Sequence, residues 1–117
     1  MPELQEMTLM RIFISENDRF EKRPLFEAVM ELLLKEGFSG ATVLKGAMGF
    51  GSSSIMHTDR ILRLSQDLPV VVEVVEEQTK IDAILPRIEG MFQGGLITLE
   101  KARVIRFGEK RSHDQSN

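Results

Sequence analysis

The sequence predicts an α+β fold, a ferredoxin-like sandwich of order β-α-β-β-α-β with two helices covering one face of a four-stranded antiparallel sheet. Strands are expected at 8–15, 40–47, 70–76 and 96–107, the first and last from residues that alternate between two sides, the second from an apolar run that enters a glycine segment and the third from the valine-rich run VVVEVVE. Apolar stripes at helical spacing mark one helix between the first two strands and another between the last two. A length of 117 residues with 42% hydrophobic content is typical of one globular domain.

The first helix follows the first strand after a charged loop at 16–23. It begins at Pro24, a residue that the first helical turn tolerates, and Gly37 ends it. Its apolar stripe consists of Leu25, Val29, Leu32 and Leu33.

The second helix spans 78–92 and contains Pro86, which predicts a kink. Its apolar stripe consists of Ile81, Ile84, Leu85 and Ile88. Gly94 and Gly95 then break the chain before the last strand, whose alternation allows an interruption near Lys101.

The first and third strands are apolar on both faces. One face carries Phe13, Val71 and Val75, and the other carries Ile12, Val70, Val72 and Val74. Two helices cover only one face of a sheet, so the second apolar face needs a partner sheet or subunit. We therefore expect self-association.

Composition narrows the classes of function. With no Cys and two His, disulfides and thiolate chemistry are excluded, and little remains for a zinc or Ser-His-Asp site. A net charge of -3 and the absence of Tyr and Trp argue against nucleic acid as a partner. The apolar runs are too short for a bilayer and no signal peptide is visible, so we expect a cytoplasmic protein.

One domain is expected at 8–107, between a polar lead-in at 1–7 and a polar tail at 108–117.

The stretch 41–54, ATVLKGAMGFGSSS, is the first candidate site. Gly46, Gly49 and Gly51 permit close approach of a ligand to the backbone, and Lys45 adds a positive charge, a combination that suits phosphate. The spacing matches neither the Walker nor the Rossmann pattern, and the same composition also occurs in loops without function. The connection at 48–68 is longer than a compact domain usually contains, which favours a functional loop.

Two further segments offer phosphate ligands. Gly94-Gly95 supplies unhindered backbone N–H groups, and Arg103 and Arg106 supply guanidinium forks. Each also has an ordinary structural interpretation, the glycines as a helix stop and the arginines as solvated strand residues. His57 is the only histidine near the loop, and without a nucleophile pattern or clustered carboxylates it favours hydrogen bonding or packing. No catalytic and no metal-ligating residue is assigned, and we expect no enzyme.

Three runs of the chain resemble a known family. They are LMRIFISENDRFEKRPLFEAVMELLLKEGFSGATVLKGAMGFG, IMHTDRILRLSQDLPVVVEVVEE and GGLITLEKARVIRF. Together they resemble the PII-like family catalogued as domain of unknown function 190, which is related to the PII nitrogen-regulatory signalling proteins, from residue 9 to residue 107. The resemblance implies a PII-type homotrimer.

In PII regulators, adenine nucleotides lie in clefts between subunits, held by the base of a long loop, by a glycine turn and by basic residues near the C-terminus. The resemblance implies that the segment 45–51, Gly94-Gly95, Arg103 and Arg106 play these parts here and bind ATP, ADP or AMP. The chain departs from PII proteins in having no lysine after the glycine turn and no loop tyrosine for uridylylation.

The leading hypothesis is therefore a non-enzymatic trimeric signalling protein that binds an adenine nucleotide and presents its 48–68 loop to a partner protein, such as a membrane transporter or channel. One alternative is a CutA-like divalent-metal tolerance protein, which the lack of Cys and the scarcity of His weaken. Another is a small-molecule sensor subunit of a transporter.

Overall fold

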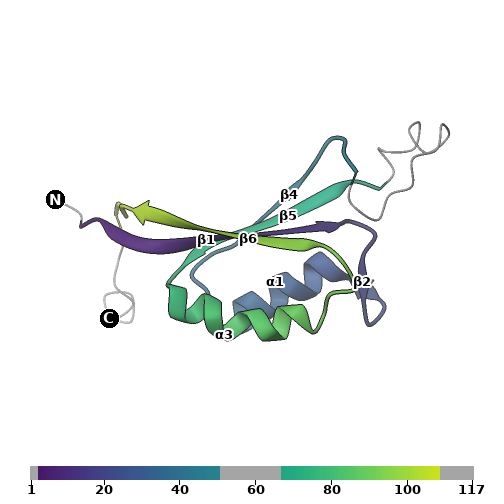
Figure 1. The fold of residues 1–117 in the computed structure, drawn as a ribbon, viewed down its shortest axis with the longest axis horizontal. Coiled ribbons are helices and arrows are strands. Elements are labelled where there is room, and N and C mark those ends of the chain that lie inside the picture. The colour runs from purple at the N-terminus through teal and green to yellow at the C-terminus, as the bar shows by residue number, and fades with distance from the viewer. Residues whose placement is uncertain (1–2, 51–66, 109–117) are drawn as a thin grey trace.

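The protein is described by a computed structural model that covers residues 3–50 and 67–108. Its elements are β1 (Gln5–Ser15), β2 (Arg19–Phe20), β3 (Arg23–Pro24), α1 (Leu25–Lys35), β4 (Thr42–Lys45), β5 (Pro69–Glu76), α3 (Gln78–Glu89) and β6 (Leu96–Val104). Four strands form an antiparallel sheet of order β4-β5-β1-β6, and both helices lie on one face of it (Figure 1). The predicted α+β, β-α-β-β-α-β sandwich is confirmed.

The core lies between the sheet and the two helices. Alternate residues of β1 and β5 point toward the helices and are buried, as are most of the predicted helix stripes. The central members are Met10, Ile12, Val70, Val72, Leu25, Val29, Leu33, Ile81 and Ile88. Burying each such side chain stabilises the fold by about 1.5–3 kcal/mol, so the helix face is settled by hydrophobic burial. Within the described residues, no helix is long and apolar enough to span a membrane.

The first and last residues of the strands differ from the predicted ones because they depend on where hydrogen bonding to the neighbouring strand begins and ends. β1 begins at Gln5, earlier than the predicted residue 8, because Gln5 pairs with Val104 of β6. β6 is uninterrupted at Lys101, which pairs with Thr8, and it ends at Val104. β4 contains only Thr42–Lys45, shorter than predicted, since β5 is its partner in the sheet over just those residues.

The helices also differ in detail. α1 begins at Leu25, with Pro24 as the residue before it, and α3 continues through Pro86 but ends at Glu89 instead of 92. Gly37 terminates α1 as predicted: its φ is 80°, and the N–H groups of Gly37 and Phe38 bond back to Leu34 and Leu33.

The predicted charged loop at 16–23 contains a small hairpin. β2 and β3 pair there, and Glu21 and Lys22 form the turn with φ values of 50° and 71°. A two-residue hairpin turn of type I′ needs positive φ at both positions, which Asn and Gly usually supply. The sequence EK carries no such signal, so the hairpin was not predicted.

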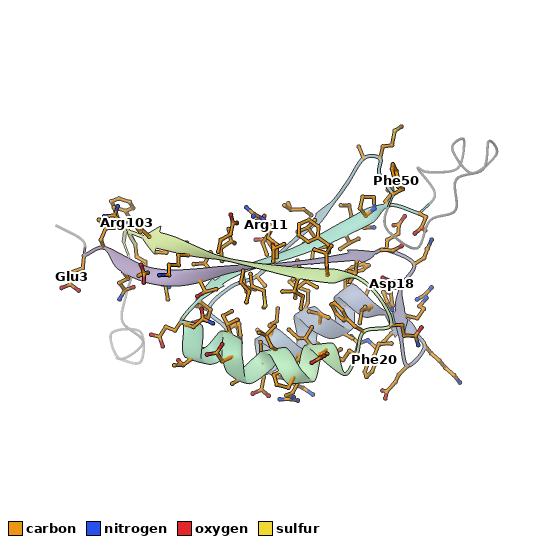
Figure 2. All side chains as sticks on the ribbon, in the orientation of Figure 1. Glu3, Arg11, Asp18, Phe20, Phe50 and Arg103 are labelled. Carbon is orange, nitrogen blue, oxygen red and sulfur yellow. The ribbon has the colours of Figure 1, made fainter. Side chains whose placement is uncertain are left out.

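The other face of the sheet carries no helix among the described residues (Figure 2). Leu9, Phe13, Val71 and Val75 are half-buried there, and Leu44 and Leu96 are exposed. We call this surface the open face. At its centre the Arg11 guanidinium lies 2.9 Å from Glu73 Oε2 and 2.7 Å from Glu100 Oε1, and these hydrogen bonds raise the pKa of Arg11.

Candidate functional site

Lys45 ends β4 on the helix side of the sheet. It pairs with Val70 of β5, and its Nζ lies 3.4 Å from Glu16 Oε2. The ammonium also lies 5.7 Å from the centre of the Phe26 ring of α1, a distance at which the ring attracts a cation. The side chain is 52% exposed, so an anion from solution can still reach it.

The glycines after Lys45 pack against Pro69. A β-carbon on Gly46 would come 2.7 Å from Pro69 Cγ, and one on Gly49 would come 2.9 Å from the same atom. Gly46 N–H also donates to Pro69 O at 2.8 Å. Glycine is therefore needed at both positions for packing, whatever else the segment binds. Gly51, the third predicted glycine, lies outside the described residues.

Glu16, just after β1, contacts Lys45, which precedes residues 51–66 in the chain, and Leu68, which follows them. Its Oε2 pairs with Lys45, while its Oε1 accepts a hydrogen bond from Leu68 N–H at 3.3 Å. Glu16 N–H donates to Leu68 O at 2.9 Å. Beside it, the Ser15 hydroxyl donates to Asp67. Sequence reasoning missed Glu16 because an acidic residue after a strand is common and its partners are distant in sequence.

The two glycines before β6 have different structural roles. Gly95 has φ 119°, and a β-carbon there would lie 2.7 Å from Phe13 O and 3.2 Å from Ile14 Cγ2. At Gly94, among the described residues other than Gly94 itself and its two chain neighbours, no atom lies within 4 Å of the position that a β-carbon would take. The fold thus requires glycine at position 95, whereas Gly94 leaves its backbone open to a ligand.

A cavity of about 320 Å³ adjoins the glycine turn on the β6 edge of the sheet. It is lined by Leu85, Glu89, Phe92, Gly95, Leu96 and Ile97. Its walls are largely apolar side chains, which suit the flat face of a base or a similar ring.

Arg103 and Arg106 lie at the opposite end of the sheet. Leu96 pairs with Phe13, but Arg103 pairs with Glu6, so Gly95 and Arg103 are separated by most of the length of β6, about 27 Å. Figure 2 places Arg103 near Glu3, whereas Phe50 and Asp18 lie at the other end. Arg106 Nη2 lies 3.6 Å from Met7 Sδ, also at the Arg103 end.

One chain therefore does not bring the three predicted segments together. The Lys45 segment and Gly94-Gly95 share one end of the sheet, but they flank opposite edges, β4 and β6. Three strand spacings separate those edges, about 14 Å. The arginines occupy the far end.

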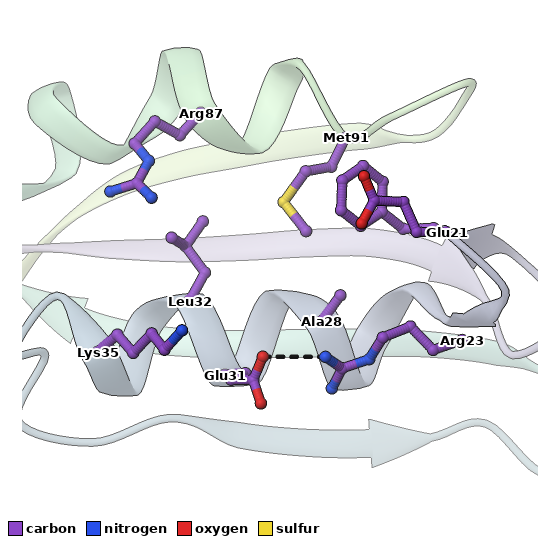
Figure 3. A pocket seen from close by; sticks show the side chains of 9 residues that line it. Glu21, Arg23, Ala28, Glu31, Leu32, Lys35, Arg87 and Met91 are labelled. Atoms are coloured by element: carbon purple, nitrogen blue, oxygen red, sulfur yellow. Dashed lines mark hydrogen bonds and ion pairs between the residues drawn. The ribbon is translucent and has the colours of Figure 1, made fainter.

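A second cavity, of about 300 Å³, lies between α1, α3 and the β2–β3 hairpin (Figure 3). Its lining includes Phe20, Arg23, Glu31, Leu32, Arg87 and Met91, and none of the predicted site residues. The hydrogen bond and charge of Arg23, 2.9 Å away, lower the pKa of Glu31. Over residues 3–50 and 67–108, no group of three or more His, Cys, Asp and Glu is placed to hold a metal ion.

Known structures share this fold. A nitrogen-regulatory PII-like protein of Thiomonas intermedia K12, solved with ADP, AMP and bicarbonate bound, superposes with a TM-score of 0.63 at 14% identity, covering 87% of this chain and 98% of that one. A Thermus thermophilus protein assigned to the PII-like signalling proteins gives a TM-score of 0.61 at 18% identity, covering 88% and 93%. At such identities the likeness shows the fold, which is that of the PII-like signalling proteins.

Sequence relatives define the family more closely. One UPF0166 protein of Aquifex aeolicus is 39% identical over 97 residues, covering 83% of this chain and 91% of that protein. A UPF0166 protein of Methanocaldococcus jannaschii is 36% identical over 99 residues, covering 84% and 91%. The model of domain of unknown function 190, described as uncharacterized ACR, matches residues 7–104. The chain belongs to this family, and the resemblance seen in its sequence is confirmed.

Proposed function

We propose that the protein is a trimeric, non-enzymatic PII-like signalling protein of the cytoplasm. It binds an adenine nucleotide, ATP, ADP or AMP, in clefts between subunits and presents its 48–68 loop to a partner protein. The partner is a protein whose activity follows nucleotide levels, such as a membrane transporter or channel.

The observation that carries this proposal is the register of β6. Gly94-Gly95 lies at one end of β6, and Arg103 pairs with Glu6 near the other. A nucleotide that contacts both must therefore touch two protomers, because no single chain bends one end of its sheet onto the other. Lys45 and Gly94 supply cationic and N–H contacts from one end, and Arg103 and Arg106 of a neighbouring protomer complete the phosphate site.

The open face supplies the contact between protomers. It is apolar at Leu9, Phe13, Val71 and Val75, and covering it removes that area from water at about 25 cal/mol per Å². The charges at its centre are already paired, because Arg11 contacts both Glu73 and Glu100. Covering the face therefore leaves no unpaired charge of this group in the interface.

The solved structures support the choice of ligand. The Thiomonas intermedia protein with this fold was solved with ADP and AMP bound. In the present chain, Gly94 keeps its backbone open and the adjoining cavity is apolar, features that suit a phosphate and a ring placed side by side. Gly46, Gly49 and Gly51 follow Lys45 in the sequence, and we include them in the phosphate site as small residues that permit close approach.

Complementation between two variants tests the shared site. Lys45→Met and Arg103→Met each remove one cation, and each should weaken ATP binding about tenfold or more. The two variants are coexpressed with different tags, and mixed trimers are purified through both tags. Some clefts of a mixed trimer then contain an intact Lys45 from one protomer and an intact Arg103 from the next, so calorimetry should detect a subset of sites with the original affinity.

Trimers of either variant alone are the controls, and they should show weak sites only. If mixing never restores a strong site although each variant weakens binding, the two residues act within one protomer and the cleft is wrong. If neither variant weakens the binding of ATP, ADP or AMP, the nucleotide assignment itself fails. Titration with copper and zinc beside the nucleotides checks the metal alternative directly.

A further inference from the structure

We propose that the Glu16 carboxylate competes with bound phosphate for the Lys45 ammonium. This competition sets the affinity of the Lys45 end of the site for phosphate and its preference for highly charged ligands. The inference rests on the proposed function only in that it assigns a phosphate to Lys45. It adds to the site a residue, Glu16, that no sequence motif indicated, and it states that the charge of this residue weakens phosphate binding.

The contacts hold the competitor in place. Glu16 Oε2 is 3.4 Å from Lys45 Nζ, and the Glu16 side chain is 22% exposed against 52% for Lys45. The second oxygen of the same carboxylate accepts Leu68 N–H, and the backbone of Glu16 donates to Leu68 O. These bonds keep the carboxylate beside Lys45 when an anion arrives, so it cannot simply swing away into solvent.

The lysine is equally constrained. Its ammonium lies 5.7 Å from the centre of the Phe26 ring and 3.4 Å from Glu16 Oε2, and the 52% of the side chain that is exposed leaves room for a ligand. A phosphate oxygen that binds there must share the ammonium with Glu16 and approach a carboxylate of like charge. Asp18 and Asp67 lie nearby, bonded to the backbone N–H and hydroxyl of Ser15, and they add to the negative field.

Two consequences follow. Neutralising Glu16 should strengthen phosphate binding, and the gain should grow with the charge of the ligand, so ATP gains more than AMP. A bound phosphate should also weaken the hold of Glu16 on Lys45 and change the hydrogen bond at Leu68 N–H, which belongs to the same carboxylate.

A double-mutant cycle tests the inference on the full chain. The variants are Glu16→Gln, Lys45→Met and the double variant, titrated with ATP, AMP and inorganic tripolyphosphate. Glutamine keeps an oxygen to accept Leu68 N–H, so stability should change little. Glu16→Gln should raise affinity for ATP and tripolyphosphate severalfold to about tenfold, which does not exceed the low end of one charge-assisted contact, and affinity for AMP by less. In the Lys45→Met background the same change should have much less effect.

Glu31→Gln is the matched control. It removes the same charge from a carboxylate that is also paired with a cation, Arg23, but on the wall of the second cavity. It should leave all three affinities unchanged. The amide exchange rate of Leu68, measured with and without tripolyphosphate, is an independent readout that should change on binding.

The outcomes separate the two proposals. If the parent binds ATP and Glu16→Gln binds it equally or more weakly, the competitor role is wrong while the nucleotide site stands. If Glu16→Gln raises ligand affinity equally in the parent and in the Lys45→Met background, the competitor role is also wrong, because Glu16 would then act by repelling the ligand and not through Lys45. If the parent binds no nucleotide but Glu16→Gln gains tripolyphosphate affinity through Lys45, the competitor role stands and the nucleotide proposal fails. If the parent and Glu16→Gln bind none of the three ligands, both proposals fail.

Discussion

The carbonyl oxygen of Phe13 occupies the space that a side chain on Gly95 would need. A β-carbon at Gly95 would lie 2.7 Å from it, and the φ of 119° at Gly95 is one that other residues rarely adopt. The neighbouring Gly94 has neither constraint within the described residues. Two adjacent glycines that look alike in the sequence therefore differ in what they do, one serving the fold and the other left open for a ligand.

Alanine substitutions should separate these two roles. Gly95→Ala should destabilise the protein by about 1–3 kcal/mol from backbone strain alone, with the contact at Phe13 O adding to it. Gly94→Ala should stay within about 0.5 kcal/mol of the parent. Urea unfolding at one fixed protein concentration measures both. Equal destabilisation by the two variants would contradict the structural difference.

Gly94→Val should reduce nucleotide binding without loss of stability. A branched side chain at an open position leaves the fold intact but blocks the approach of a phosphate or nucleoside to the backbone. If the turn contacts the nucleoside or the first phosphate, affinity for AMP and for ATP should fall alike. Calorimetric titration measures affinity, and the melting temperature of the free protein serves as the control. Unchanged affinity for both ligands would remove the turn from the site.

The open face should hold the trimer together. Val71→Asp places a charge among Phe13, Leu44 and the other apolar side chains of that face, where the Arg11 guanidinium is already bonded to Glu73 and Glu100. The variant should dissociate or unfold, as light scattering over a range of concentrations will show. Leu34→Asp is the control, since Leu34 is 77% exposed on α1, and it should leave the mass unchanged. A parent protein that is monomeric at micromolar concentration would argue against the assembly.

The Glu31 carboxyl should titrate below its ordinary pKa of 4.5, because Arg23 donates a hydrogen bond to it and carries the opposite charge. A folded-state pKa below the unfolded value means that the pair contributes stability above the unfolded pKa and loses it as the pH falls through the folded pKa. Both side chains are substantially exposed, so the contribution is small and screened by salt. Carbon NMR titration should show the pKa return toward 4.5 in Arg23→Gln, and no change there would contradict the pair.

By itself the sequence determined the order of the four sheet strands and the two described helices, and the buried face of each of these helices. Apolar periodicity is a local property, and it located the stripe at Ile81, Ile84 and Ile88 without any knowledge of tertiary contacts. The end of α1 at Gly37 was equally readable, because a residue with φ of 80° favours glycine. The same local reasoning found the apolar residues of the open face.

Only the tertiary structure decided which of the predicted site residues lie close together in space. Strand register and sheet order are non-local, so no pattern indicated that Arg103 pairs with Glu6 and lies at the far end of the sheet from Gly95. Nor did any pattern connect Lys45 to Glu16, whose contact arises because β1 and β4 end at the same end of the sheet, on either side of the start of β5. The residue types that suit phosphate could be named from the sequence, but their distances and their internal partners depend on how distant strands align.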